Sequence, residues 1–207
     1  MKKSTKSIFK YILEFLIVAF GVFLGIYTSD LQNEKKIKRE KEKSINYILI
    51  ELENNKSNLE ESIEYHQLIK SNMDSLASTL TEKDMFANYM RNKKFQHNQI
   101  KGWNGVRLAD IENTAFESVK ISGIIQEYDI ELIQIISKIY KRQEAYSEFG
   151  KSLLDRILSL NSSTKVFDVF GSVKLMTTDL LSIEKQLLTA LEKVQKDIKM
   201  AHSYTTK

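Results

Sequence analysis

The hydropathy pattern begins with an uncharged apolar stretch close to the N-terminus. Residues 15–27 contain no charged side chain, and the longer stretch 11–28 is interrupted by charge only at Glu14. As a helix, these 18 residues extend about 27 Å, close to the hydrocarbon thickness of a bilayer. Tyr11 and Tyr27 stand at its ends, where aromatic rings favour the membrane interface. The pattern therefore predicts a transmembrane helix over residues 11–28.

The flanks of this stretch bear on its retention and orientation. The basic tail, residues 1–10, would suit a cleaved signal peptide, but the sequence at 26–30 is a poor cleavage site, which favours an uncleaved anchor. Lys10 abuts the span, whereas residues 29–34 on the far side are mostly polar and lack basic side chains. This favours the inner membrane with the N-terminus cytoplasmic and the domain periplasmic. In the reverse orientation the basic run at 35–43 would lie against anionic lipid.

Four residues in and beside the span are candidates for more than anchoring. An acid inside hydrocarbon is costly, so Glu14 is a candidate for ion or proton handling. Lys10 lies four residues earlier on the same helical face, and the favoured interpretation is an interfacial Lys10–Glu14 pair. Gly21 and Gly25, about one turn apart, would let another helix approach closely, which indicates self-association or a partner span.

Beyond the span, apolar side chains recur at seven-residue steps, the pattern of a long amphipathic helix reaching about residue 80. The sequence leaves the continuity of this helix open. Asn54-Asn55 precedes Ser57 and Glu60, which have capping-box spacing, and Ser71-Asn72 is a second polar step. The apolar stripe consists of Leu31, Ile45, Leu52, Leu59, Met73 and Leu80.

Two further helices are predicted downstream. Asp129 is the expected N-cap of a helix whose apolar stripe spans residues 132–160, and a last helix is expected over about 177–201. Amphipathic helices cannot bury their stripes alone. The sequence therefore predicts an all-α fold in which the transmembrane helix continues into an antiparallel, coiled-coil-like helical bundle, residues 29–201, followed by a tail, 202–207.

The segment between these long helices holds a candidate interaction surface. Trp103 lies in a strong turn signal within residues 81–106, which are expected to reverse the chain. Thr114 and Glu117 fit a capping box that opens a short helix over 115–122. Gly123 then stands where a helix end favours a left-handed residue. The favoured interpretation is a structural corner, and the alternative is a partner-binding surface made by Trp103, Phe116, Glu117, Lys120 and Gly123.

Composition supports the helical prediction and excludes several functions. Proline is absent where average usage would give about ten, so helices can run long. Cysteine is absent, which excludes disulfides, thiol catalysis and cysteine zinc sites. The net charge of +4 arises from 31 basic and 27 acidic residues. The basic run at 35–43 is interleaved with glutamates, so no nucleic-acid partner is predicted.

No catalytic, nucleotide-binding or metal motif is recognisable in the chain. His66, His97 and His202 lack the spacings of a metal site, and neither nucleophile elbows nor phosphate-binding loops occur. His66 occupies a position on the apolar stripe and is interpreted as a half-buried packing residue, with a ligand or pH sensor as the alternative. We therefore expect no enzyme, no cofactor and no small-molecule substrate.

Two phrases resemble a family of small single-span bacterial membrane proteins of unknown function. The first is the span from 14 to 22 with its polar exit at Asn33-Glu34. The second is residues 116–123, where the family reads roughly Tyr-Glu-x-Leu-Lys-x-Ser-Gly. Leu13 replaces the family's glycine, and Leu31-Gln32 replaces its Asn-Trp step. The resemblance implies the envelope of Gram-negative bacteria and brings no activity with it.

Two hypotheses about function follow from these features. The first is a membrane-anchored helical interaction module, a scaffold or sensor, whose partners are the lipid bilayer and a protein or further copies of the chain. The second is a homo-oligomer in which Glu14 from several copies handles ions or protons across the membrane.

Overall fold

The computed structural model describes residues 4–205, with side chains described over 9–201, and this part of the chain is helical without a named strand. The side chains of Lys2, Lys3, Lys6 and His202 lie outside the described residues. The α-helices are α1 (Ser4–Ala77), α2 (Glu82–Phe86), α3 (Thr114–Ile121), α4 (Ile130–Leu158), α5 (Val166–Leu175) and α6 (Leu181–Thr205). The 3-10 turns are η1 (Tyr89–Arg91), η2 (His97–Gln99) and η3 (Ile124–Glu127), and η4 (Met176–Leu180) is a π-helix.

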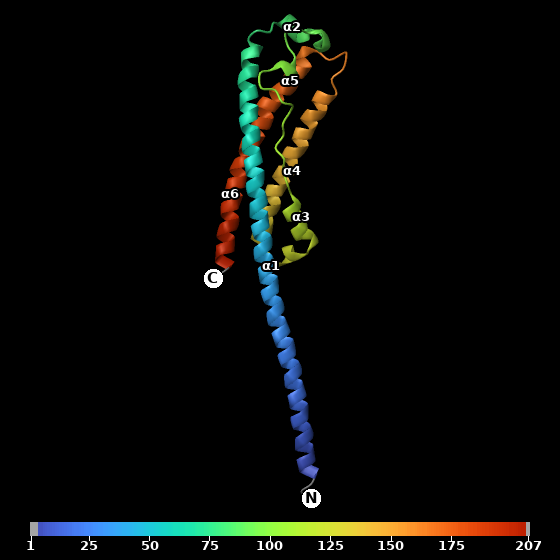
Figure 1. Ribbon diagram of the computed structural model, residues 1–207, viewed down its shortest axis with the longest axis vertical. Helices are drawn as coiled ribbons and strands as arrows, with labels where there is room; N and C mark the ends of the chain where they lie inside the picture. Colours follow the sequence, from blue (N-terminus) through green and yellow to red (C-terminus); the bar gives the residue numbers. More distant parts are fainter. Residues whose placement is uncertain (1–3, 206–207) are drawn as a thin grey trace.

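Helix α1 is a single uninterrupted helix of 74 residues, which corresponds to a length of about 110 Å (Figure 1). Neither 54–55 nor 71–72 breaks it. The side-chain amides of Asn55 and Asn72 instead donate hydrogen bonds of 2.7 and 2.8 Å to backbone carbonyls of residues 101–113. Polar residues that locally favour a helix end are therefore used for a tertiary contact.

Residues 9–28 of α1 are mostly apolar and exposed, and this part of the helix extends away from the bundle (Figure 1). An 18-residue window has a mean hydropathy of 2.0 and no buried residue, so this helix is long and apolar enough to cross a membrane. Among the side chains of α1 that the structure describes, Ile45 is the first that is buried. Between the apolar part and the bundle, residues 29–40 form an exposed stretch of about 18 Å, here called the stalk.

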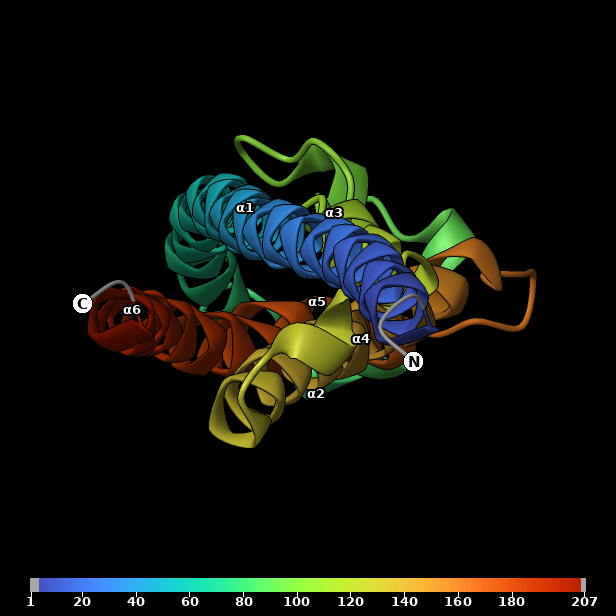
Figure 2. The same ribbon diagram turned by 90° about the horizontal axis from the view of Figure 1, so that it is seen from below.

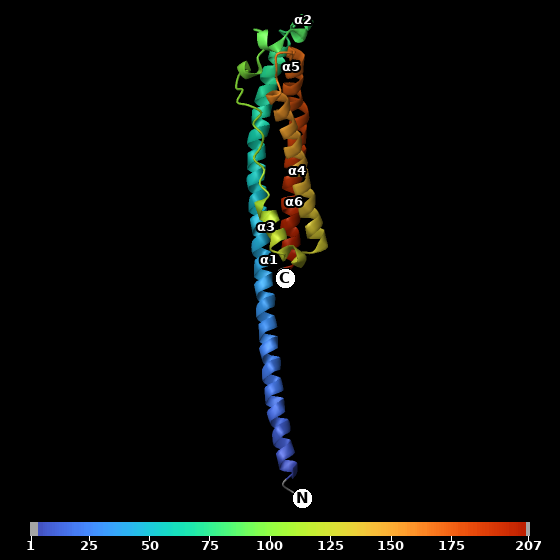
Figure 3. The ribbon, with the colours of Figure 1, turned by 90° about the vertical axis from the view of Figure 1, so that its right-hand side faces the viewer.

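The bundle is built from the second half of α1 with α4 and α6 (Figure 2). Helices α1 and α4 point the same way, and α6 runs antiparallel to both and contacts both (Figure 3). The predicted all-α fold, an apolar N-terminal helix followed by packed helices, is confirmed. The stripe positions that become fully buried core include Ile45, Leu52, Leu59, Met73, Leu132, Ile139, Tyr146, Leu153, Leu180 and Leu187.

An extended segment, residues 101–113 and here called the strap, returns the chain along α1 (Figure 3). It has no neighbouring strand, so its backbone polar groups need other partners. Side chains of α1 supply them, and from Asn55 to Tyr65 they follow one another at the helical spacing of three or four residues. The α1 donors to strap carbonyls are Asn55 to Glu112, Asn58 to Asp110, Ser62 to Arg107, Tyr65 to Gly105, His66 to Val106 and Asn72 to Lys101.

The strap also packs against α4, where Gly150 leaves room for Leu108. A Cβ at Gly150 would stand 2.6 Å from the Cδ2 atom of Leu108, whereas one at Gly171 in α5 would meet nothing within 4 Å.

We therefore expect Gly171→Ala to raise the free energy of unfolding by about 0.5–1 kcal/mol, because alanine favours helix. Gly150→Ala should lower it by about 1 kcal/mol through overpacking.

The measurement is chemical denaturation of the full-length chain in detergent. Adding Leu108→Ala to Gly150→Ala should remove the clash and recover part of the helix-propensity gain. If Gly150→Ala stabilised the protein as much as Gly171→Ala, the strap would not be packed tightly against α4 at Gly150.

Candidate functional site

Helix α3 begins against a carboxylate supplied by α1. The predicted capping box is wrong, because the N-cap is Asn113, whose side chain makes no capping bond, and Thr114 is already helical. Glu51 accepts a 2.7 Å hydrogen bond from the backbone N–H of Ala115 instead. An acid at a helix N-terminus satisfies a free N–H and interacts favourably with the helix dipole. A residue 64 positions away in sequence thus replaces the local cap.

The second carboxylate oxygen of Glu51 joins α4 to the same point. It accepts a 2.5 Å hydrogen bond from the hydroxyl of Tyr140, and both side chains are buried. Burial raises the pKa of Tyr140, and the negative charge of Glu51 raises it further. The ring of Phe116 stacks on the ring of Tyr140 with a centroid separation of 4.5 Å. The ammonium of Lys120 lies over the Phe116 ring, 4.8 Å from its centroid.

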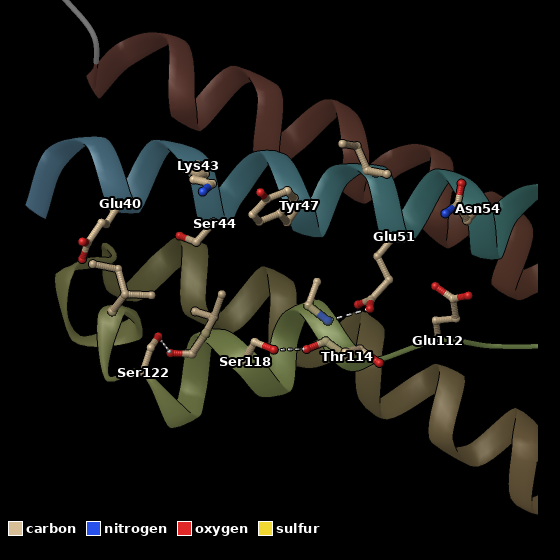
Figure 4. A pocket seen from close by; sticks show the side chains of 14 residues that line it. Glu40, Lys43, Ser44, Tyr47, Glu51, Asn54, Glu112, Thr114, Ser118 and Ser122 are labelled. Carbon is tan, nitrogen blue, oxygen red and sulfur yellow. Dashed lines mark hydrogen bonds between the residues drawn. The ribbon is translucent and has the colours of Figure 1, made fainter.

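An open apolar groove of about 570 Å³ lies between α1 and α3, and Figure 4 shows the side chains around it. Tyr47 and Ile50 of α1 are half exposed there, at 51% and 50%. Glu40 and Lys43 line the end nearer the stalk, and Glu112 lies at the other end. We call this feature the α1–α3 groove. It combines exposed apolar surface with a charged rim, a composition typical of protein-binding surfaces.

The structure does not bring Trp103 next to the α3 residues. Gly102 packs against Leu68 of α1, whereas Ala115 is bonded to Glu51, which places the two regions about 25 Å apart along α1. Trp103 is half-buried and contacts His97 edge-on at 5.1 Å. At the corner around α3, Phe116 and Val119 are buried, whereas Ile121 is 86% exposed.

The individual residues of that corner have local structural roles. Phe116 is buried, and Glu117 forms an ion pair with Lys120 on the surface. Gly123 has φ of +77°, the left-handed conformation predicted for it. Asp129 is the N-cap residue of α4 as predicted, but its side chain makes no capping bond and pairs with Lys41 at 3.7 Å. This pair fixes the start of α4 beside the end of the stalk.

The candidates of the apolar segment lie on an unpartnered part of α1. The ammonium of Lys10 is 3.8 Å from a carboxylate oxygen of Glu14, and both side chains are more than half exposed. A Cβ at Gly21 or Gly25 would meet no atom within 4 Å. The geometry supports the paired interpretation of Glu14, and it leaves the glycine face open to another helix.

A buried polar network that sequence reasoning missed connects all three long helices. His66 is fully buried, which corrects the expectation of a half-buried packing residue. Its Nδ1 lies 2.9 Å from Glu184 of α6, and its Nε2 lies 2.8 Å from the carbonyl oxygen of Val106 in the strap. The hydroxyl of Tyr146 in α4 donates to the other oxygen of Glu184 at 3.1 Å.

The protons of this network follow from its acceptors. The carbonyl of Val106 can only accept, so Nε2 of His66 carries a hydrogen. The hydrogen bond between His66 Nδ1 and Glu184 therefore contains one further proton. On His66 this proton gives an imidazolium–carboxylate pair, and on Glu184 it gives a neutral pair. Burial and the charge of Glu184 raise the pKa of Tyr146, so this hydroxyl stays protonated and acts as a donor. Both His66 and Glu184 are 0% exposed, so the network is closed to solvent.

A sequence signal for this network exists in hindsight. His66 and Glu184 each occupy a core-facing position on an otherwise apolar stripe, on two different helices. An ionisable base and an ionisable acid at core-facing positions of two helices suggest a buried pair. The π-helix Met176–Leu180 ends one turn before Glu184 and shifts the register of α6 there.

Comparisons with protein-family models, curated proteins and solved structures found no match for this chain. The family resemblance therefore stays a prediction. Among the described residues, no group of three or more His, Asp or Glu side chains is arranged to hold a metal ion.

Removing one member of the buried pair leaves the other without compensation. Glu184→Ala should lower the free energy of unfolding by about 3–5 kcal/mol, since an unpaired buried group carries its full desolvation cost. His66→Ala should cost a similar amount, and the double variant should cost less than the sum, with a coupling of at least about 1 kcal/mol. Chemical denaturation of the full-length chain measures all three.

Glu192→Ala is the matched control, because Glu192 is exposed on the same helix and its loss should change stability by less than about 0.5 kcal/mol. Additive costs of the two single substitutions would contradict a direct His66–Glu184 interaction.

Proposed function

We propose that this chain is a membrane-anchored helical interaction module, a scaffold or sensor of the bacterial envelope. The observation that carries the proposal is that anchor and bundle share one helix. Phe15 of α1 is 71% exposed on an apolar segment, whereas Leu52 of the same helix is fully buried in the core. An exposed apolar segment of this length is stable in lipid and not in water.

Two features support a role in binding a protein. The uninterrupted stalk would hold the bundle about 18 Å from the lipid as a rigid extension of the span. Both buried acids already have hydrogen-bond partners for their two oxygens. Glu51 is bonded by Ala115 and Tyr140, and Glu184 by His66 and Tyr146. Neither acid is therefore available as a catalytic base. What the bundle offers is surface, and the α1–α3 groove is its open apolar part.

The glycine face and the α1–α3 groove lie on one side of α1. Gly25 precedes Lys43 by 18 residues and Ile50 by 25 residues, which are about five and seven helical turns. A partner whose own span packs at Gly21 and Gly25 would therefore reach the groove without crossing α1. The partner we propose is another membrane-anchored chain, or a second copy of this one.

The first test concerns the membrane and the orientation. We expect the full-length chain to sediment with membranes, to remain there after alkaline carbonate, and to require detergent for release. Because the chain contains no cysteine, Ser152→Cys on exposed α4 introduces a single thiol. A membrane-impermeant maleimide should label this thiol without lysis of the inner membrane. Labelling only after lysis would show that the bundle is cytoplasmic. A chain that stays in the supernatant would contradict the proposal of a membrane anchor.

The second test concerns the groove. A photoreactive phenylalanine analogue at position 50 should give one discrete cross-linked adduct in membranes, whereas the same analogue at position 68 should not. Ile50 and Leu68 are both 50% exposed on α1, but only Ile50 lines the groove. An adduct at a multiple of 24.0 kDa identifies a second copy as the partner. Gly25→Leu should reduce the yield several-fold, and equal cross-linking from both positions would contradict a groove-specific partner.

A further inference from the structure

The end of the bundle farthest from the apolar segment exposes large apolar side chains. Phe86 of α2, Met90 of η1 and Phe167 of α5 are 58%, 54% and 57% exposed. Helix α2 and the beginning of α5 lie at the end of the molecule opposite the N-terminus (Figure 1). Other phenylalanines of the bundle, such as Phe95 and Phe116, are buried. We call the three exposed side chains the distal patch.

The two rings of the distal patch are held in place by the fold. The rings of Phe86 and Phe167 stack with a centroid separation of 6.4 Å and an interplanar angle of 15°. Beside them, the backbone N–H of Val166 donates a 3.0 Å hydrogen bond to the carbonyl of Ala87, which joins the end of α2 to the start of α5. The fold therefore keeps two aromatic rings in water, which is unfavourable unless another apolar surface covers them.

The surroundings of the distal patch are basic. Residues 81–101 contain five basic and two acidic side chains, and one of the acids, Asp84, is paired with Lys94 at 2.9 Å. From α5, the ammonium of Lys165 lies 5.6 Å from the centroid of the Phe86 ring. The exposed basic side chains of residues 81–101 that form no ion pair with a described residue are Lys83, Arg91, Lys93 and Lys101. The patch thus offers apolar surface beside uncompensated positive charge.

Charge and size together select the occupant of the distal patch. A second copy of the chain would bring the same cations face to face, because a two-fold interface pairs a surface with itself. Three side chains also cover much less than the area of about 800 Å² that each partner buries in a stable protein–protein interface. An anionic lipid surface requires less area, because a few apolar side chains enter the headgroup boundary while neighbouring cations attract the headgroups.

We propose that the distal patch binds the surface of a second, anionic bilayer, so that the chain bridges two lipid surfaces. Phe86, Met90 and Phe167 enter the headgroup region, and the surrounding cations stay at the level of the phosphates. Residues 28–77 of α1 extend about 74 Å, which sets the separation of the two bilayers when this helix stands upright. The proposal rests on the membrane anchor and goes beyond the interaction module, because it requires no partner in the α1–α3 groove.

The test places the full-length chain in nanodiscs of phosphatidylcholine, so that neutral lipid surrounds the apolar segment and the distal patch stays free. The discs are mixed with vesicles that contain about 30% phosphatidylglycerol or with vesicles of phosphatidylcholine alone, and the bound protein is measured by flotation. We expect at least about ten-fold more binding to the anionic vesicles at low salt. This preference should be lost at about 1 M salt, because salt screens exposed charges.

Phe86→Ser combined with Phe167→Ser should reduce binding to the anionic vesicles at least about ten-fold, because two rings are then absent from the headgroup region. The matched control is Ile121→Ser combined with Ile130→Ser, which changes side chains that are 86% and 70% exposed at the end of the bundle nearer the stalk. This control should bind like the wild type. The basic tail, residues 1–10, is the same in both variants, so a difference between them belongs to the distal patch.

A second variant tests the cations separately from the rings. Replacing the basic side chains beside the patch by glutamine should reduce binding to the anionic vesicles at least about ten-fold, whereas the same loss of charge on α4 should change it by less than about three-fold. The patch variant combines Lys83→Gln, Arg91→Gln and Lys93→Gln, and the control combines Lys138→Gln, Lys141→Gln and Lys151→Gln at exposed positions. Wild-type protein that does not bind the anionic vesicles would overturn the proposal, and so would equal losses in the patch variants and their controls.

Discussion

The architecture depends on how the backbone of the strap is satisfied. A segment that runs extended along a bundle without a sheet neighbour leaves its N–H and C=O groups without regular partners, and each one that is buried unpaired would cost free energy. Helix α1 solves this with polar side chains, from the buried Asn55 to the partly exposed Asn72, that bond the strap along its length. The arrangement requires α1 to be straight and unbroken, because a break would move the donors out of register.

The position of the strap then determines where the rest of the chain lies. It carries the chain back along α1 to Glu51, where α3 is capped, so that α4 can begin beside the end of the stalk at the Lys41–Asp129 pair. As a result α4 runs in the same direction as α1, and α6 runs antiparallel to both and contacts both (Figure 3). The extended strap takes the place that an antiparallel helix would occupy in a simpler bundle.

Buried charge in this bundle occurs at junctions between elements. Glu51 joins α1, α3 and α4, and Glu184 joins α6 to α1 and α4, each with both oxygens hydrogen-bonded. Such groups add little net stability relative to apolar side chains, but they penalise any packing that separates the partners. They therefore favour one register of the long helices, which apolar stripes of similar spacing leave open. Gln143 of α4 is buried too, but among the described residues its side-chain amide has no hydrogen-bond partner.

Local patterns in the sequence determined the apolar segment, the long amphipathic helices, most of the core positions and the left-handed turn at Gly123. These features depend on the spacing of residues within a few turns, so periodicity reveals them. Only the tertiary structure decided that α1 continues through Asn55, that Glu51 replaces Thr114 as the cap of α3, and that His66 meets Glu184, 118 residues away. A polar residue that would end a helix in isolation is retained within it when a distant segment accepts its hydrogen bond, and no local pattern records that distant partner.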